Sequence, residues 1–303
     1  MRLNKKRTES AGSRIFDVVN ILIMIVILVA VLYPILNIIS TSLSSSRFIS
    51  SGSVTVWPKG FTVQAYKDVF QDPYIFKGYG NSILYAVGST GIMLIFTSLM
   101  AYPLTVPGFI GKKFFTIFLM ITMFFSGGLI PTYLLMRSLH MLDTVWVMII
   151  PGAVGAYNVF LFRTFFSNIP AELKESALID GANDFTVLFR IIMPLSKALL
   201  ATFALFGLVG SWNSWFEALI YLRDQDKYPL QMILRNYLFA LDTTAIQGRV
   251  GAGNVAINGP GNALDPKAIR MSVIIITMFP IMAIYPFFQK HFNNGVFVGA
   301  IKG

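Results

Sequence analysis

The sequence predicts an all-α membrane protein with six transmembrane helices. Hydrophobic residues make up 55% of the 303 residues, whereas Asp, Glu, Lys and Arg together make up only 13%, about half of their share in a typical soluble domain. The mean hydropathy is +0.67. Six stretches lack any charged residue and are long enough, at about 1.5 Å per residue, to cross a hydrocarbon core about 30 Å thick. Such a chain has too few polar side chains for a surface in water, which excludes a soluble enzyme, a disordered protein and a secreted disulfide scaffold.

The charge-free stretches are 18–39, 82–106, 114–136, 144–162, 198–216 and 271–289. With interfacial residues they give a single transmembrane domain over 1–303, with spans at about 16–40, 81–106, 113–137, 143–166, 195–221 and 269–290. The first is longer than the roughly 7–15 apolar residues of a cleavable signal peptide, so we expect an uncleaved helix. The second and third stretches are long enough to cross the membrane without extension at their ends. The last three are shorter, and Arg163, Lys197 and Arg270 at their ends can reach the headgroups and extend them by a turn. Gly127-Gly128 before Pro131 indicates either a hinge or close helix packing.

Basic residues at the N-terminus predict the orientation. Only Glu9 opposes them before the first span, and they are Arg2, Lys5, Lys6, Arg7 and Arg14. The positive-inside rule then places the N-terminus in the cytoplasm, and six spans return the C-terminus to the same side. Residues 167–194 become a cytoplasmic loop, and 41–80 and 222–268 become external loops. The net charge of +10 therefore reflects orientation in lipid, and we expect no nucleic-acid partner.

Residues that could catalyse a reaction or bind a metal are missing. The sequence has no cysteine, and its two histidines, His140 and His291, are expected on opposite sides of the membrane. No P-loop sequence is present, and Glu217 is the only acidic residue near membrane depth. We expect no catalytic residue and no metal site, and if the protein moves a solute uphill, its energy source is another polypeptide.

The cytoplasmic loop reads as two short helices joined by a tight turn at Gly181. Ser167 or Asn168 can cap the first helix, with Pro170 in its first turn, and Asn183 or Asp184 can cap the second. Pro194 is expected to open the fifth span. By these features alone the loop is an amphipathic connector on the membrane surface.

The same loop resembles the EAA loop of ABC-importer permeases. Glu175-Ser-Ala-x-x-Asp180-Gly181-Ala182 is followed after eight residues by Ile191-x-Met193-Pro194, and Ser176 and Met193 are mild departures from the family pattern. The resemblance implies a type I importer permease fold, N-in and C-in, and a loop helix that docks on an ATPase. Glu175 would pair with a basic ATPase residue, or is simply solvated beside Lys174, and Asp180 would brace the turn. The residues expected to couple are Leu173, Glu175, Ala177, Asp180, Gly181, Ala182, Ile191 and Pro194, of which Leu173, Ala177 and Ala182 would form the apolar docking face.

Two further segments are similar to carbohydrate-uptake permeases of the maltose type. The first is Ser211-Trp-Asn-Ser-Trp-Phe-Glu-Ala-Leu-Ile220, and the second is the ending Gly299-Ala-Ile-Lys302-Gly303. The resemblance implies import of oligosaccharides through the bacterial cytoplasmic membrane by a multi-pass subunit without catalysis of its own. Its partners would be a second homologous permease, two ABC ATPase subunits, an extracytoplasmic solute-binding protein and membrane lipid. ATP and Mg would be used by the ATPase, and this chain would bind no cofactor. The tail, through Gly299, Lys302 and Gly303, would reach the ATPases, or is a frayed end.

Polar residues within spans are costly against lipid and predict the substrate path. The polar candidates are Asn158, Ser211, Asn213 and Glu217, and the candidates for flat sugar-stacking surfaces are Tyr157, Trp212 and Trp215. These aromatic residues are equally typical of interfacial anchors. The external segment 223–267 is Gly-rich, which indicates a flexible loop, and the resemblance implies that it reaches into the binding protein.

Three other functions stay open. An ABC permease for a polyamine or phosphate would share the cytoplasmic loop but not the Trp-Asn stretch or the tail. A facilitative channel or secondary transporter would work without an ATPase, and a membrane-embedded enzyme would need a catalytic cluster. The basic residues of the outer loops suit an acidic oligosaccharide, or equally an acidic surface of the binding protein; they are Arg47, Lys59, Arg223 and Arg249.

Overall fold

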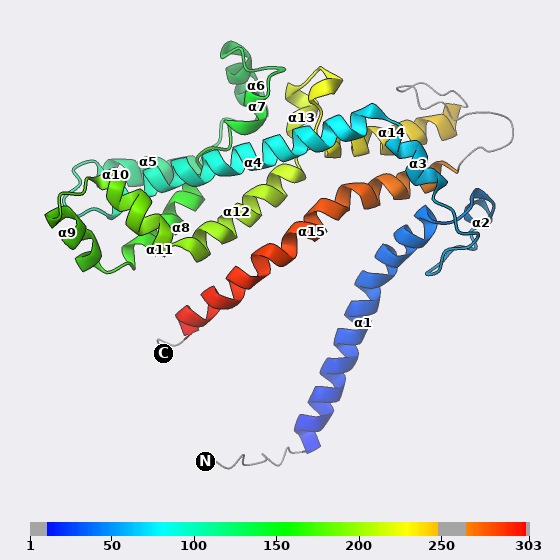
Figure 1. Cartoon of the computed structure of the whole chain (residues 1–303), viewed down its shortest axis with the longest axis horizontal. Helices are drawn as coiled ribbons and strands as arrows, with labels where there is room; N and C mark the ends of the chain where they lie inside the picture. Colours follow the sequence, from blue (N-terminus) through cyan, green and yellow to red (C-terminus); the bar gives the residue numbers. More distant parts are fainter. Residues whose placement is uncertain (1–10, 248–264, 301–303) are drawn as a thin grey trace. The chain divides into compact units, whose positions relative to one another are not determined.

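The computed structural model describes residues 11–247 and 265–300, and over these ranges the chain is helical without strands (Figure 1). It divides into two compact units. The first contains residues 1–71 and 250–276, and the second contains residues 72–249 and 277–303. The all-α prediction is therefore confirmed.

The first unit contains α1 (Ala11–Ser42), α2 (Ser46–Ser50), α3 (Gln64–Phe70) and the start of α15 (Pro266–Ala300). The apolar segment Ile15–Ser42 has no buried residue in its most apolar 18-residue window, so its side chains are suited to lipid. At the end of α1, Asn37 Nδ2 donates to the carbonyl of Thr55 at 2.9 Å, and Ser40 donates to the carbonyl of Val56. These bonds hold the segment after α2 against the end of α1.

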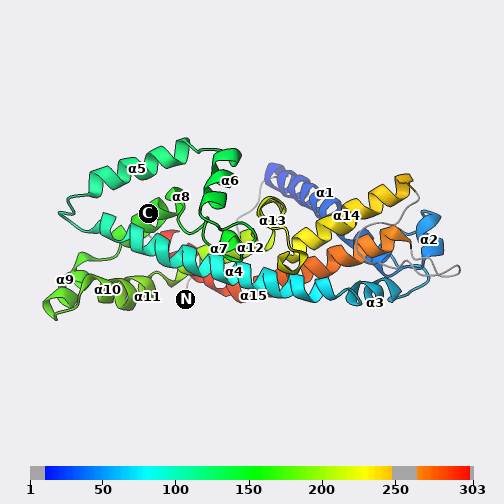
Figure 2. The same cartoon turned by 90° about the horizontal axis from the view of Figure 1, so that it is seen from above.

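The second unit is built on α4 (Pro73–Ala101), which packs against α7 (Trp146–Ile149), α8 (Ala156–Ser167), α12 (Lys197–Trp212) and α14 (Leu230–Gln247). Asp72 caps α4 by accepting from the amide of Tyr74 at 2.9 Å, and Pro73 fits the first turn. A Cβ added to Gly207 of α12 would lie 2.7 Å from Thr90 Oγ1 of α4. These helices therefore approach as closely as helices with small residues do in membrane proteins. They run side by side in Figure 1, and α4 covers much of α12 in the view of Figure 2.

The third predicted span is sharply bent, and the fifth follows a sharp bend. α5 (Lys112–Phe124) and α6 (Leu129–Ser138) are inclined by 118°. Gly128 at the break has φ +83°, and a Cβ added there would have nothing within 4 Å, which favours the hinge interpretation over close packing. The predicted fifth span consists of α12 and α13 (Phe216–Tyr221), and the helical segment Asp184–Leu195 meets α12 at 83°.

The predicted fourth span is also interrupted, because 150–155 separates α7 from α8. Pro151 there lacks the amide hydrogen that a continuous helix needs. Three of the described helices are long and apolar enough to cross a membrane, and the number rises to five if each bent pair is one span. The six-span count and the N-in, C-in orientation therefore stay predictions.

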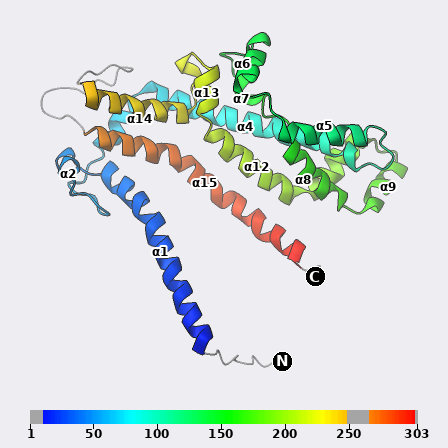
Figure 3. The same cartoon turned by 180° about the vertical axis from the view of Figure 1, so that it is seen from behind.

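Short helices complete the second unit. They are η1 (Pro103–Thr105), α9 (Ala171–Ile179), α10 (Asp184–Val187), the π-helical turn η2 (Leu188–Ile192), α11 (Met193–Leu195) and η3 (Gln225–Lys227). Figure 3 shows α9 and α14 at opposite ends of α4. Each end has its own apolar cluster, one around Tyr102, Phe162 and Phe166 and the other around Tyr85, Val147 and Tyr221.

Candidate coupling loop and transport path

The turn between α9 and α10 has the backbone geometry of a Schellman motif. The amide of Ala182 donates to the carbonyl of Ala177 at 2.9 Å, and the amide of Gly181 donates to the carbonyl of Leu178 at 3.1 Å. Gly181 has φ +83°, a left-handed conformation that side-chain-bearing residues adopt at a cost. The side chain of Asn183 accepts from the amide of Thr186 at 2.8 Å and caps α10. The prediction of two helices joined at Gly181 is confirmed, and the cap is Asn183 rather than Asp184.

The expected cap of the first helix is wrong. Ser167 is the last residue of α8, Asn168 follows it as the C-cap, and the residue before α9 is Pro170. Pro170 has no side-chain oxygen, so its side chain cannot cap the helix. Glu172 in the first turn still complements the positive end of the helix.

The position of Pro194 also differs from the expectation. Pro194 lies in α11, before the 83° bend, and α12 begins at Lys197. At the bend, the buried Ser196 donates through Oγ to the carbonyl of Ile192 at 2.7 Å. Pro194 therefore belongs to the loop at 167–194 and does not open the span. Ile191, half-buried, lies in the preceding π-helical turn.

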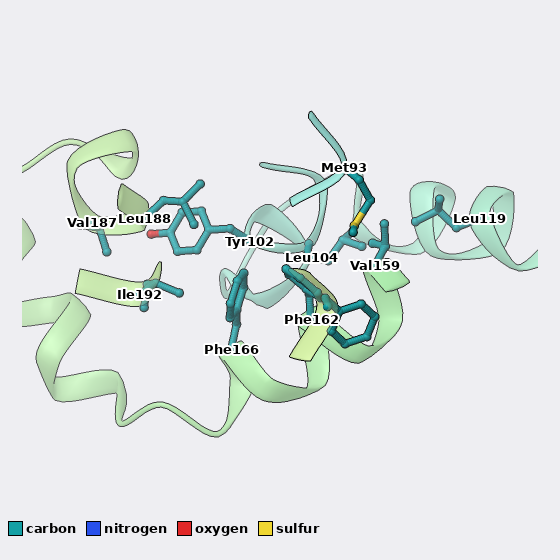
Figure 4. Packing of buried hydrophobic residues seen from close by; sticks show 12 residues of the cluster. Met93, Tyr102, Leu104, Leu119, Val159, Phe162, Phe166, Val187, Leu188 and Ile192 are labelled. Carbon is teal, nitrogen blue, oxygen red and sulfur yellow. The ribbon is translucent and has the colours of Figure 1, made fainter. Parts of the chain in front are cut away.

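The loop is fixed to α4 and α8 through buried side chains. Val187, Leu188 and Ile192 are at most 2% exposed and pack in the cluster of Tyr102, Leu104, Phe162 and Phe166 (Figure 4). Tyr102 Oη donates to Asp184 Oδ1 at 3.1 Å. These contacts connect the loop to the end of α4. The sequence pattern of the loop does not predict that Tyr102 and Phe166 contact it, because both residues are distant in sequence from the loop residues that they meet.

Two of the residues expected on the docking face are turned toward the chain itself. Ala177 and Ala182 are half-buried against the same cluster. The exposed apolar side chains of the loop are instead Leu173 at 45%, Leu178 at 49% and Ile179 at 86%. Glu175 and Asp180 are exposed beside them. The outward side of α9 is therefore apolar and acidic, and Leu173 is the member of the expected face that it retains.

Lys174 is engaged away from Glu175. Its Nζ donates to the carbonyl of Phe166 at 3.2 Å, and burial lowers the pKa of the ammonium group. Among the ion pairs of the described ranges, none contains Glu175. The carboxylate of Glu175 therefore stays available to an external cation.

The predicted path residues fall into two groups. Tyr157, exposed, and Asn158, half-buried, lie in the first turn of α8, whereas the others surround the break between α12 and α13. Half-buried Ser211 and buried Trp212 end α12, and exposed Asn213, Trp215 and Glu217 follow them. Within the described ranges no hydrogen bond, ion pair or ring contact joins the two groups. The Trp-Asn stretch is therefore the more compact candidate.

Trp212 does not offer a surface to a sugar. Its side chain is 4% exposed, and Nε1 donates to the carbonyl of Thr277 in α15 at 3.1 Å. Its indole thus ties α12 to α15 within the second unit. Trp215, by contrast, is 41% exposed, and the guanidinium carbon of Arg235 lies 5.3 Å from the centre of its ring.

Sequence reasoning missed the helix that carries Arg235. The predicted external loop contains α14, an 18-residue helix. Buried Leu230, Ile233 and half-buried Tyr237 recur at helical spacing on it, a periodicity that the later glycines hid. Residues 248–264 of the loop and 301–303 of the tail lie outside the described residues, as do the side chains of residues 287–300.

A charged cluster fixes the short segment between α13 and α14. Asp143 Oδ1 accepts from the amides of Arg223 and Asp224, both at 3.1 Å, and Asp143 Oδ2 pairs with Lys227 Nζ at 3.2 Å. The charged groups here are thus paired with each other. Within the described part of the chain, no group of three or more His, Cys, Asp or Glu side chains lies close enough together to bind a metal ion.

Comparison with known proteins identifies the family. Residues 78–298 match the family model of the binding-protein-dependent transport system inner membrane component. The chain is 42% identical over 296 residues to Protein LplC of Bacillus subtilis (strain 168), with 97% of each chain covered. It is 34% identical over 291 residues to the polygalacturonan/rhamnogalacturonan transport system permease protein YtcP of the same organism, with 96% of this chain and 99% of YtcP covered.

A solved structure agrees with this assignment. The chain is similar to one from a bacterial ABC transporter involved in the import of the acidic polysaccharide alginate, with a TM-score of 0.87 and 32% sequence identity. The similarity covers 95% of this chain and 100% of that chain. The predicted importer permease fold is thereby confirmed. The chain belongs to the inner membrane components of binding-protein-dependent transport systems, as a non-catalytic permease subunit of an ABC importer that works with a partner ATPase and a substrate-binding protein.

Proposed function

We propose that the protein is a multi-pass permease subunit that imports oligosaccharides through the bacterial inner membrane. The observation that carries this proposal is the likeness over nearly the whole chain to permeases named for polygalacturonan and rhamnogalacturonan and for arabinooligosaccharides. The path residues agree with a sugar, because Asn213 offers an amide and Trp215 an exposed ring beside it.

The complete transporter in this proposal contains two homologous permeases, two ATPase subunits and an external binding protein. The ATPases bind and hydrolyse ATP with Mg, and this chain binds neither. The exposed acidic and apolar side of α9 supports a docking contact with an ATPase, because Ile179, Leu173 and Glu175 are available there. The tail at Gly299, Lys302 and Gly303 is proposed as a second contact.

The coupling step follows from how the loop is held. Closure of the ATPases displaces α9, and the buried contacts of Leu188 and Ile192 carry this displacement to α4 and α8. The hydrogen bond from Tyr102 to Asp184 adds a polar connection to the same end of α4. The substrate path then opens in response to ATP rather than by thermal fluctuation alone.

Transport by the reconstituted complex tests the proposed function. The permeases, ATPases and binding protein are incorporated into liposomes, and uptake of labelled galacturonan and arabinan oligomers is measured with ATP and with a non-hydrolysable analogue. We expect uptake of at least one oligosaccharide with ATP only. Uptake of spermidine or phosphate but of no oligosaccharide would contradict the proposal, and uptake without ATPase subunits would indicate a facilitative channel.

A further inference from the structure

Helix α14 presents two different faces to the rest of the second unit. On one face, the amide of Leu230 donates to Ser82 Oγ at 2.8 Å, and Tyr237 Oη donates to Asp72 Oδ2 at 2.6 Å. Ile233 on that face lies against Gly78. All three partners belong to α4 or its cap. This face fixes the helix and is closed to a ligand.

The other face carries Gln231, Arg235 and Phe239, spaced by four residues each. It meets the break between α12 and α13. Gln231 Nε2 donates to Asn213 Oδ1 at 3.2 Å, and the guanidinium carbon of Arg235 lies 5.3 Å from the Trp215 ring and 4.7 Å from the Phe239 ring. The missed helix is thus joined to the Trp-Asn stretch that the sequence identified.

Arg235 lacks an anionic partner among the described residues. Its side chain is half-buried, its Nε is fully buried without a hydrogen-bond acceptor, and none of the described carboxylates pairs with it. Asp72, the acid that binds Tyr237 on the same helix, is already used on the opposite face. Taking a guanidinium partly out of water without a carboxylate is costly, and ring faces compensate only part of that cost.

We propose that Arg235, Trp215, Asn213 and Gln231 form a binding subsite for a carboxylate-bearing sugar unit, such as a uronate, within the transport path. The guanidinium donates to the sugar carboxylate, as planar fork geometry favours. The amides of Asn213 and Gln231 lie beside it for hydroxyl groups, and the exposed part of Trp215 offers an apolar surface for the ring. This inference rests on the proposed import of oligosaccharides and specifies their charge.

A comparison of the uptake of two substrates, one with and one without carboxyl groups, tests the subsite. Complexes carrying Arg235→Gln, Arg235→Lys or no substitution are reconstituted with the binding protein, and ATP-dependent uptake of trigalacturonate is compared with that of the same oligomer reduced at its carboxyl groups. We expect Arg235→Gln to lower kcat/KM for trigalacturonate by about ten- to a hundredfold and that for the reduced oligomer by less than about threefold. Arg235→Lys keeps the charge but loses the planar fork, so we expect its kcat/KM for trigalacturonate to lie between the values of Arg235→Gln and the unsubstituted complex.

Arg137→Gln is the matched control, because it removes an equal charge from an exposed residue of α6 that belongs to neither the Arg235 cluster nor the loop at 167–194. It should leave both uptakes unchanged. Equal loss of both substrates in Arg235→Gln, together with weaker binding of the binding protein, would show that Arg235 contacts that protein, and this would overturn the subsite. The ratio of kcat/KM for trigalacturonate to that for the reduced oligomer can also stay unchanged in an Arg235→Gln complex that elutes normally on size-exclusion chromatography. That result would overturn the subsite and leave the proposed function standing. Failure of the unsubstituted complex to take up either oligomer, while it takes up an arabinan oligomer, would overturn the subsite alone. Failure to take up any oligosaccharide would contradict the proposed function itself.

Discussion

The backbone of the coupling loop depends on one residue that tolerates a left-handed conformation. Gly181 has φ +83° and ends α9 in a Schellman motif. The sequence predicts both Gly181 and the capping Asn183, because each acts through atoms a few residues away. It does not predict that Lys174 binds the carbonyl of Phe166, or that Tyr102 binds Asp184 across 82 positions. Such contacts arise only when distant segments pack.

Substitution of Gly181 should separate transport from ATP hydrolysis. In Gly181→Val the left-handed conformation costs about 1–2 kcal/mol, so the turn and the direction of α9 change. We expect uptake to fall at least tenfold while ATP hydrolysis continues and the protein still inserts in the membrane. Gly80→Ala is the control, because Gly80 lies in α4 with nothing within 4 Å of an added Cβ. Normal substrate-stimulated uptake in Gly181→Val would count decisively against the coupling role.

Among the helices, the close packing of α4 on α12 is sensitive to a single methyl group. The hydroxyl of Thr90 is buried without a hydrogen-bond partner in the described chain, and Gly207 faces it. Apolar length predicts where helices lie, but it does not show where Gly128, Pro151 and Ser196 redirect them. It also favours continuous spans over a short amphipathic helix such as α14. The differences between expected and observed helices are therefore concentrated at bends and in the outer loop.

Substitution of Gly207 should be corrected by a second substitution in α4. Gly207→Ala would place Cβ 2.7 Å from Thr90 Oγ1 and 3.0 Å from Thr90 Cγ2, so we expect destabilisation by about 1–3 kcal/mol. Thr90→Ala removes both atoms, and the double variant should melt close to the unsubstituted protein. Gly210→Ala on the same helix has open space and serves as the control. Thermal unfolding in detergent measures all four, and additive effects in the double variant would exclude the contact.

At the scale of the whole molecule, the second unit separates its two tasks along α4. The loop with α9 lies at one end, and α14, the helix that carries Arg235, lies at the other. The coupling end follows from a motif with fixed spacing. The sequence does not predict the proposed subsite at the other end, because Arg235 lies 20 positions beyond Trp215 and the two side chains meet only in the folded chain.

The docking surface predicts a specific assembly defect. Ile179→Glu places a charge at the most exposed apolar position of α9, where burial of the side chain by an ATPase is worth about 1.5–3 kcal/mol. We expect ATPase co-purification to fall at least tenfold with the thermal stability of the permease unchanged. Ile110→Glu, at a fully exposed isoleucine outside the loop, should have no effect. Equal ATPase recovery from both variants would remove α9 from the interface.

The bend at Ser196 also has a mechanical consequence. α12 has 16 residues and is therefore about 24 Å long. The preceding helical segment meets α12 at 83°. A rotation of this segment about its own axis would therefore move the far end of α12 sideways. A roll of about 10° would sweep the far end of α12 through about 4 Å, close to the width of a sugar ring. In the proposed coupling step, the bend would thus convert a small rotation of the loop helices into a displacement of about 4 Å at Trp212 and Asn213.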